Sequence, residues 1–212
     1  MNYTLTRHAL LRFTGAVTAA AIVVLLTGCD PNRMGGELSK RVEMDGYSFL
    51  PPVDPGWLIA SRSKEEITLL KAGNMEGQTY SIQGRHVALD SLADSGGLLD
   101  FTEMTHRNVF PQPRFRIREH DMSDLQISGA DCAMSHIVAE DLDPGSGSNV
   151  VTAVLIDAVG TICIHPTRAN LGIALIYTHR SFPEDRDRGF EGLASSVLRT
   201  QQFGGDAGRG DN

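Results

Sequence analysis

The chain has 212 residues and a formal net charge of −7 at pH 7, with 26 acidic against 19 basic side chains. This acidic balance does not suit a binder of nucleic acid or anionic lipid, whose affinity comes from neutralising phosphates. The composition therefore predicts no nucleic-acid partner. The length supports one domain with a real hydrophobic core.

The N-terminal segment has the order of a bacterial secretory signal. Arg7 and Arg12 give it a positive start, and an apolar run follows from Phe13 to Leu26. The run is shorter than the roughly 20 apolar residues that a membrane helix needs. It ends in Leu26-Thr27-Gly28-Cys29, which resembles the lipobox of bacterial lipoproteins.

The lipobox resemblance implies that residues 1–28 are a cleaved signal peptide and that Cys29 is the lipidated first residue of the mature chain. A lipid anchor, with palmitate among its chains, would then hold the protein to the extracytoplasmic (periplasmic) face of a membrane. An uncleaved anchor and an ordinary secretory signal are the alternatives. Because Arg7 and Arg12 would leave with the signal and no acidic residue would, the formal charge would fall from −7 to −9.

Residues 29–46 are polar, include a Gly35-Gly36 pair, and are predicted to form a flexible tether. A single domain is predicted over residues 47–203. The prolines that follow Tyr47 argue against a helix or a central strand there. Trp57, the only tryptophan, is expected to fill one end of the core. Three short segments rich in β-branched and aromatic residues then predict an antiparallel meander: 57–63, 67–72 and 79–87.

Two helices are predicted. Asp100, three residues before Glu103, resembles a capping box and starts an apolar period over about residues 99–109. Phe190 to Leu198 carries apolar residues at the spacing of one helix face, on which Leu193 and Val197 are expected to face the sheet. The acidic stretch 183–185 would form its first turn. Residues 204–212 are predicted to be a disordered tail.

Further strands are predicted at 114–118, 132–142, 150–165 and 171–180, with a Gly/Ser-rich hairpin turn at 143–149. The alternation over 114–118 puts Arg114, Arg116 and Arg118 on one face. That face could be an anion-binding stripe or the solvated side of a half-buried strand.

This order of elements predicts an α+β fold, with an early helix and a C-terminal helix packed on a largely antiparallel sheet. The order, together with Leu50-Pro51-Pro52 and the stretches 160–166 and 177–180, resembles the PsbP-like fold of small extracytoplasmic lipoproteins. The resemblance covers residues 47–203. It implies an accessory or assembly role and specifies no chemistry.

Cys132 and Cys163, with His136 and His165, could offer two thiolates and two imidazoles to a metal ion. If their strands form the hairpin around residues 147 and 148, however, Cys132 faces Cys163 while the two histidines lie on the order of 20 Å apart along the ladder. The histidines could not then share one ion. Facing cysteines in an oxidising compartment are expected to form a disulfide. Two free buried thiols are the remaining alternative.

The sequence contains no nucleophile elbow, zinc-protease motif, phosphate-binding glycine loop or Cys-x-x-Cys. No catalytic residue, metal ligand or cofactor is therefore predicted. The expected function is a membrane-tethered module that binds or assembles with another protein of the cell envelope. A carrier that holds a small ligand on the concave side of the sheet and an unrecognised hydrolase are the alternatives.

Overall fold

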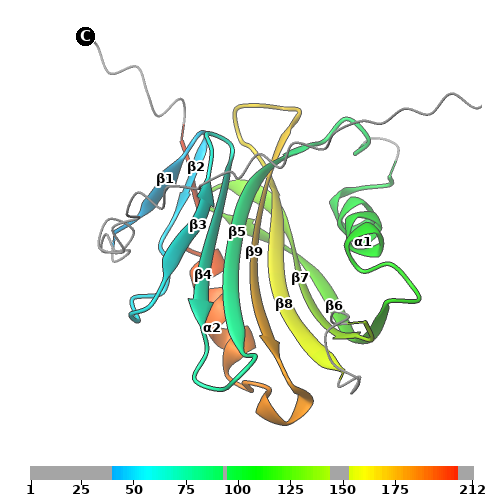
Figure 1. Cartoon of the computed structure of the whole chain (residues 1–212). Helices are drawn as coiled ribbons and strands as arrows, with labels where there is room; N and C mark the ends of the chain where they lie inside the picture. Colours follow the sequence, from blue (N-terminus) through cyan, green and yellow to red (C-terminus); the bar gives the residue numbers. More distant parts are fainter. Residues whose placement is uncertain (1–39, 93–94, 144–152, 205–212) are drawn as a thin grey trace, which may run out of the picture. The chain divides into compact units, whose positions relative to one another are not determined.

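The computed structural model describes residues 40–92, 95–143 and 153–204. Seven strands form the main antiparallel sheet, in the order β3-β4-β5-β9-β8-β7-β6 (Figure 1). Their bounds are β3 Leu58–Arg62, β4 Glu66–Ala72, β5 Thr79–Ala88, β6 Phe115–Ile127, β7 Ala130–Asp141, β8 Val154–Ile164 and β9 Leu171–Ser181. A smaller sheet has the order β1-β2-β10, formed by Val42–Met44, Tyr47–Phe49 and Gln202–Phe203. With two α-helices, the described residues have the predicted α+β class.

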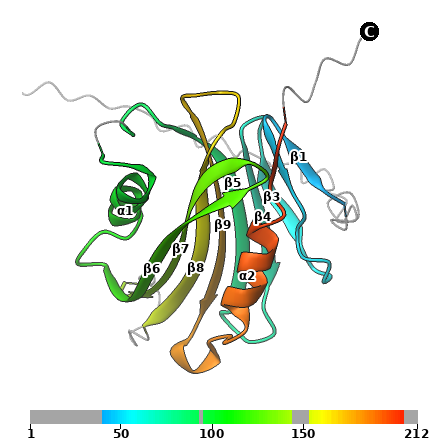
Figure 2. The ribbon, with the colours of Figure 1, turned by 180° about the vertical axis from the view of Figure 1, so that it is seen from behind.

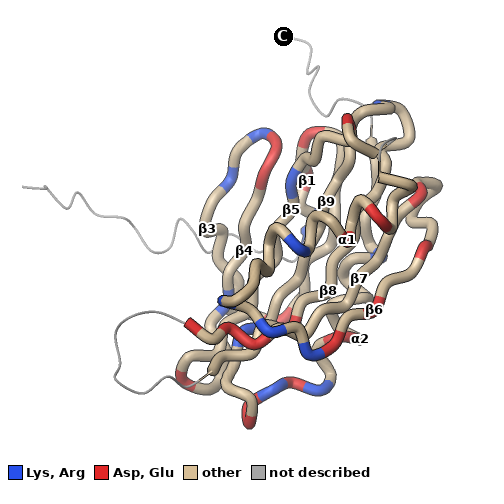
Figure 3. The backbone as a smooth tube through the Cα atoms, turned by 90° about the vertical axis from the view of Figure 1, so that its right-hand side faces the viewer, with Lys and Arg blue, Asp and Glu red and all other residues tan. Residues whose placement is uncertain are grey.

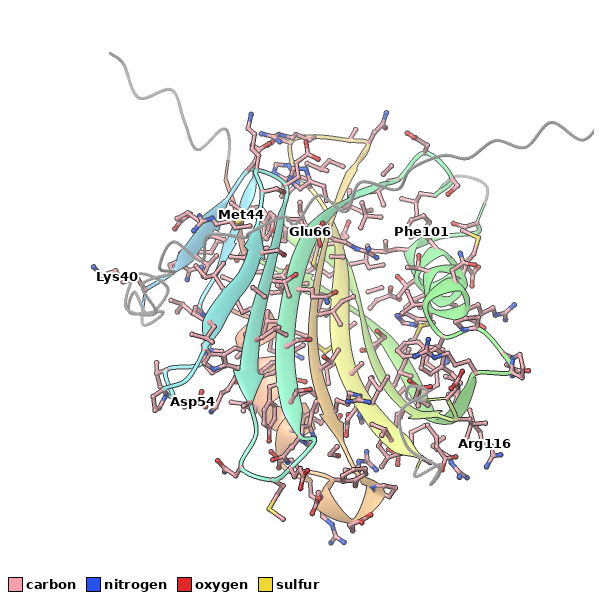
Figure 4. The ribbon with its side chains drawn as sticks, viewed as in Figure 1. Lys40, Met44, Asp54, Glu66, Phe101 and Arg116 are labelled. Atoms are coloured by element: carbon pink, nitrogen blue, oxygen red, sulfur yellow. A yellow bond between two sulfur atoms is a disulfide. The ribbon has the colours of Figure 1, made fainter. Side chains whose placement is uncertain are left out.

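The helices α1 (Leu98–Val109) and α2 (Phe190–Leu198) lie on opposite faces of the main sheet, as the two opposite views show (Figures 1 and 2). Successive residues of a strand point to opposite faces, so the strands divide their side chains between two cores. Leu175 of β9 packs with α2, whereas its neighbour Ala174 packs with Phe101 of α1. Figure 4 shows side chains of α1 and the sheet turned toward one another, with Phe101 labelled on α1.

The larger core lies on the α2 side, where α2 and the small sheet cover strands β4, β5 and β9. Trp57 is buried there and its ring meets the ring of Tyr177 edge to face, with centroids 5.6 Å apart. The predicted role of Trp57 as a core residue is confirmed. Figure 3 shows charged residues in the loops, at the ends of strands and along the edge strand β6.

The N-terminal boundary of the domain differs from the prediction. The tether was expected to reach residue 46, but β1 begins at Val42, and both Val42 and Met44 are buried against the larger core. Tyr47–Phe49 then forms β2, the central strand of the small sheet, although the following prolines argued against a central strand. The strand is possible because it ends at Phe49, before the first proline. Residues 29–39 lie outside the described residues.

The strand predicted at 114–118 extends to Ile127 and is an edge strand. Most side chains of β6 are exposed on both faces, so its second half lacks the apolar alternation that reveals a strand. A tight turn joins it to β7 through Ser128 and Gly129, whose φ angles are 49° and 81°. Both residues adopt the left-handed conformation that a two-residue hairpin turn requires.

The helix starts also differ from the prediction. Gly97 precedes α1 and no side chain caps it, so Asp100 lies inside the first turn and does not form the expected capping box. Residues 183–185 form a separate short 3₁₀ helix, and α2 begins at Phe190. Val197 is buried as expected, but Leu193 keeps 42% of its surface exposed. No helix among the described residues is long and apolar enough to cross a membrane.

Candidate functional site

Cys132 of β7 and Cys163 of β8 are direct partners in the strand register and form a disulfide, with Cα atoms 4.0 Å apart. Both residues are buried, on the same side of the sheet as Ile127 and Ala130. The disulfide predicted from the hairpin register is therefore present. Residues 144–149 of the turn predicted at 143–149 lie outside the described residues, as does the proposed lipidation residue, Cys29.

His136 and His165 do not approach each other at the disulfide. His136 is the register partner of Val159, and its Nε2 lies 2.8 Å from Asp157 Oδ1. His165 is buried, and its Nε2 donates to the backbone oxygen of Gly46 across 3.0 Å. Over the residues that the structure describes, no group of three or more His, Cys, Asp or Glu side chains could hold a metal ion.

The three arginines at the start of β6 are paired with carboxylates of the neighbouring strand β7. Arg114 makes two hydrogen bonds with Asp141, and Arg116 and Arg118 both reach Glu140. The Arg114 guanidinium lowers the pKa of Asp141. Because these charges are already matched across the ladder, the solvated-strand interpretation fits them better than an anion-binding stripe. Figure 4 labels Arg116 at the rim of the sheet.

A groove of about 290 Å³ lies between α1 and the face of the main sheet that α1 covers. Strands β5, β9, β8 and β7 form its floor, and α1 with the residues that follow it forms a wall. Its apolar lining includes Val87, Phe110, Ile137, Ile156, Ile162 and Ile176. Gly160 also lies in the floor, where a Cβ atom would crowd Ile176 Cγ1 at 3.3 Å. The volume is at the lower end of the range of ligand sites.

Arg85 of β5 is the single charged side chain among the described residues that line this groove. The other polar lining groups are neutral at pH 7 and several are already paired: the hydroxyls of Ser81 and Thr178, for example, lie 2.6 Å apart. Arg85 has no ion pair within the described part of the chain and is exposed. The groove therefore combines an apolar body with one arginine that makes no ion pair, although its register partner on β4 is the acidic residue Glu66.

A second polar group stands at the α1 end of the groove. His106 of α1 has its Nε2 3.1 Å from Ser135 Oγ of β7 and its Nδ1 3.4 Å from His120 Nε2 of β6. Burial, together with the neighbouring His120, lowers the pKa of His106 to about 4. His106 is therefore neutral at neutral pH. A second cavity, of about 400 Å³, opens on the other side of His106 and is also lined by His120.

A buried ion network lies on the opposite face of the sheet. Asp157, 3% exposed, binds His136 and also accepts from Arg186 Nε at 3.0 Å. Arg186 continues to Glu119 through two further hydrogen bonds of 2.7 and 3.1 Å. The bond to Asp157 raises the pKa of His136. The network connects β6, β7 and β8 to the segment before α2, which is a structural role.

Sequence reasoning did not identify Arg85, His106, His120 or Ser135 as site residues. They come from β5, α1, β6 and β7, and no two of them form a spaced motif. The only available signal was the expectation of a ligand on the concave side of the sheet. These four residues can be grouped only once the register of the strands and the position of α1 are known.

Comparison with known proteins adds no functional information. No protein-family model matches the chain, and no curated protein matches it. A crystal structure of a protein from Bacteroides thetaiotaomicron is similar at a TM-score of 0.37 with 14% sequence identity. The similarity covers 84% of this chain and 51% of that one, so this chain spans about half the length of the protein it matches.

Proposed function

We propose that this domain binds a small amphipathic anion, with the apolar body of the ligand in the groove beneath α1 and its carboxylate or phosphate group on Arg85. The observation that carries the proposal is the lining itself: one arginine and no acidic residue, in a chain whose net charge is −7.

The chemistry of the groove fits this ligand class. Ligand sites are mostly apolar and carry a few polar groups that fix orientation. The apolar walls would remove apolar surface of the ligand from water, which contributes about 25 cal/mol to the binding free energy for each Å² buried. Arg85 presents a planar fork of donors that matches a carboxylate or a phosphate. Acidic ligands without an apolar body would have only Arg85 to attract them against the net negative charge of the protein.

The place of action is a second part of the proposal. Cys29 in its lipobox context would tether the domain to the extracytoplasmic face of the membrane, and the PsbP-like resemblance of residues 47–203 supports a small envelope lipoprotein. A ligand carrier on a lipid tether would collect or present amphipathic molecules close to the membrane surface. Binding to an envelope protein, the function expected from the sequence, stays a prediction that crosslinking in intact membranes would test.

The test uses two fluorescent naphthalene probes of similar shape. 1-Anilinonaphthalene-8-sulfonate is an amphipathic anion, and N-phenyl-1-naphthylamine lacks its charge. Arg85→Gln should weaken binding of the sulfonate by about 10 to 100-fold, because a hydrogen bond to a charged group contributes about 1.5 to 3 kcal/mol. It should change binding of the neutral amine by less than about threefold.

The matched control is Arg199→Gln. Arg199 is exposed at the end of α2, on the opposite face of the sheet, so its substitution changes the net charge equally and leaves the groove intact. Equal effects of Arg85→Gln and Arg199→Gln on sulfonate binding would show that the probe responds to overall charge, and the proposal would fail. Urea unfolding of each variant excludes binding to partly unfolded protein.

A further inference from the structure

Three elements that are distant in sequence bring a hydroxyl and two imidazoles into a line at the α1 end of the groove. Ser135 lies on β7, His106 on α1 and His120 on β6. The Ser135 Oγ to His106 Nε2 distance is 3.1 Å, and the His106 Nδ1 to His120 Nε2 distance is 3.4 Å. Nucleophilic catalysis requires this arrangement: a hydroxyl within reach of a base, and the base held by a third group.

One tautomer of His106 makes the line a proton relay. If Nδ1 carries the hydrogen, it donates to Nε2 of His120, and Nε2 of His106 is then free to accept from the hydroxyl of Ser135. A neutral imidazole is required for this, and burial of His106 keeps it neutral at neutral pH. No carboxylate takes the third position, so His120 would act by fixing the tautomer and the ring orientation.

Ser135 is accessible from the groove although it is only 4% exposed. Its register partner on β8 is Gly160, and a Cβ atom at that position would lie 3.7 Å from Ser135 Oγ. Glycine at this position therefore keeps a side chain from standing next to the hydroxyl. Phe110 and Ile137, which line the same end of the groove, would contact the apolar part of a molecule placed there.

From this geometry we infer that Ser135 is a nucleophile that accepts acyl groups from apolar esters, with His106 as its general base and His120 as a positioning residue. Only the location of the ester rests on the proposed function, because the ester would occupy the same groove as the ligand. The Oγ of Ser135 attacks the ester carbonyl while its proton moves to His106 Nε2. The bond to the alcohol oxygen breaks, and the alcohol leaves with that proton.

The second half of the reaction uses water. A water molecule attacks the acyl-serine, gives one proton to His106, and releases the carboxylic acid as Ser135 recovers its hydrogen. The product is an amphipathic anion, the ligand class for which Arg85 suits the groove. Both steps are expected to be slow, and the second is slower than the first when the ester carries a good leaving group such as nitrophenolate. Ser135 sits within ladders to Met122 on β6 and Gly160 on β8, so its backbone N–H is not aimed at a developing oxyanion, and a missing oxyanion donor costs about 10² to 10³ in rate.

The expected signature is therefore stoichiometric acylation with little turnover. Full-length mature protein in detergent would be incubated with a neutral alkyl fluorophosphonate, whose phosphorus forms a bond to Oγ as fluoride leaves. Intact-mass analysis should find one adduct per chain, and peptide mapping should place it on Ser135. p-Nitrophenyl butyrate should give a burst of about one equivalent of nitrophenolate followed by a slow phase.

Matched variants separate this chemistry from a structural role. Ser196 is exposed on α2, on the opposite face of the sheet from the groove, so Ser196→Ala should label at the parental rate. His106→Gln should slow labelling by about 100-fold or more. His120→Gln keeps an acceptor for His106 Nδ1 and should retain most of the rate, whereas His120→Phe should lose it. The labelling rate of the parent protein should fall only in acid, as His106 protonates with a pKa of about 4.

The outcomes are distinct from those of the proposed function. Labelling on a serine other than Ser135, no adduct after prolonged incubation, or equal rates for His120→Gln and His120→Phe would overturn the inference, whatever the sulfonate probe does. Labelling of Ser135 in a protein that fails to bind the sulfonate would support the nucleophile and reject the anion carrier. Urea unfolding of each variant confirms that its fold is intact, and the site map in the parent protein does not depend on any variant.

Discussion

Replacing Leu198 and Leu193 separately by alanine tests how α2 docks, with the same chemical change at two depths on one helix. Leu198 is fully buried and belongs to the larger core, whereas Leu193 is 42% exposed. Each substitution removes three carbon atoms. At about 0.8 kcal/mol for each buried carbon, Leu198→Ala loses about 2.4 kcal/mol of transfer free energy.

A cavity would add to that loss, because the surrounding core relaxes only in part, and buried leucine-to-alanine changes cost about 2 to 5 kcal/mol in total. Leu198→Ala is therefore expected to lower the free energy of unfolding by about 3 to 4 kcal/mol. Leu193 buries little more than half of its side chain at an open surface and leaves no closed cavity. Its substitution should cost about 1 kcal/mol.

The assay is urea unfolding followed by the fluorescence of Trp57, which is buried in the same core as Leu198. With an m-value of about 2 kcal/mol/M, the Leu198→Ala midpoint should move down by about 1.5 to 2 M and the Leu193→Ala midpoint by about 0.5 M. Equal shifts for the two variants, or a larger shift for Leu193→Ala, would show that α2 docks on a different face and would refute the assigned packing.

Four further predictions follow from the sites described above. Removing the disulfide by a double Cys132→Ala, Cys163→Ala change should lower the free energy of unfolding by about 1 to 2 kcal/mol in urea. Cross-linking a free loop of this length would contribute roughly 3 to 4 kcal/mol, but here the strand ladder already joins the two residues. Alkylation of the parent protein without reductant should find neither thiol free. Burial lowers the pKa of His106 from the ordinary value of 6.5 to about 4 in the folded protein. The contribution of His106 to the free energy of unfolding is therefore complete above pH 6.5 and is lost as the pH falls from 6.5 to about 4. His106→Gln should make the free energy of unfolding fall less steeply over this acid range. Asp157→Ala should lower the free energy of unfolding by about 1 to 3 kcal/mol, because it removes the buried acceptor of His136 and Arg186, and an effect near zero would show that the network is dispensable. Cys29→Ser should move the protein from the membrane fraction to a soluble or unprocessed form, and unchanged fractionation would exclude the lipid anchor.

Elements with a strong local pattern were predictable from sequence. The strands β4, β5 and β9 and the helix α1 have bounds within one residue of the predicted ranges, because alternation and helical periodicity depend only on near neighbours. The disulfide was predictable for a related reason: the register of a hairpin follows from the position of its turn, and Cys132 and Cys163 are equidistant from it. The edge strand β6 was recognised only in its first part, since a strand exposed on both faces has no apolar alternation to detect.

The sequence by itself determined the acidic balance, the α+β class, the disulfide pair and the signal-like start of the chain, all of which follow from composition or local spacing. Tertiary structure alone decided which face of the sheet each helix covers, and therefore that Arg85 stands unpaired beside an apolar groove while Arg114 is matched by Asp141. It also decided that Ser135, His106 and His120 meet. The physical reason is that a site formed across strands depends on contacts between distant segments, and these are fixed by the packing of the whole sheet and leave no periodic trace in the order of the residues.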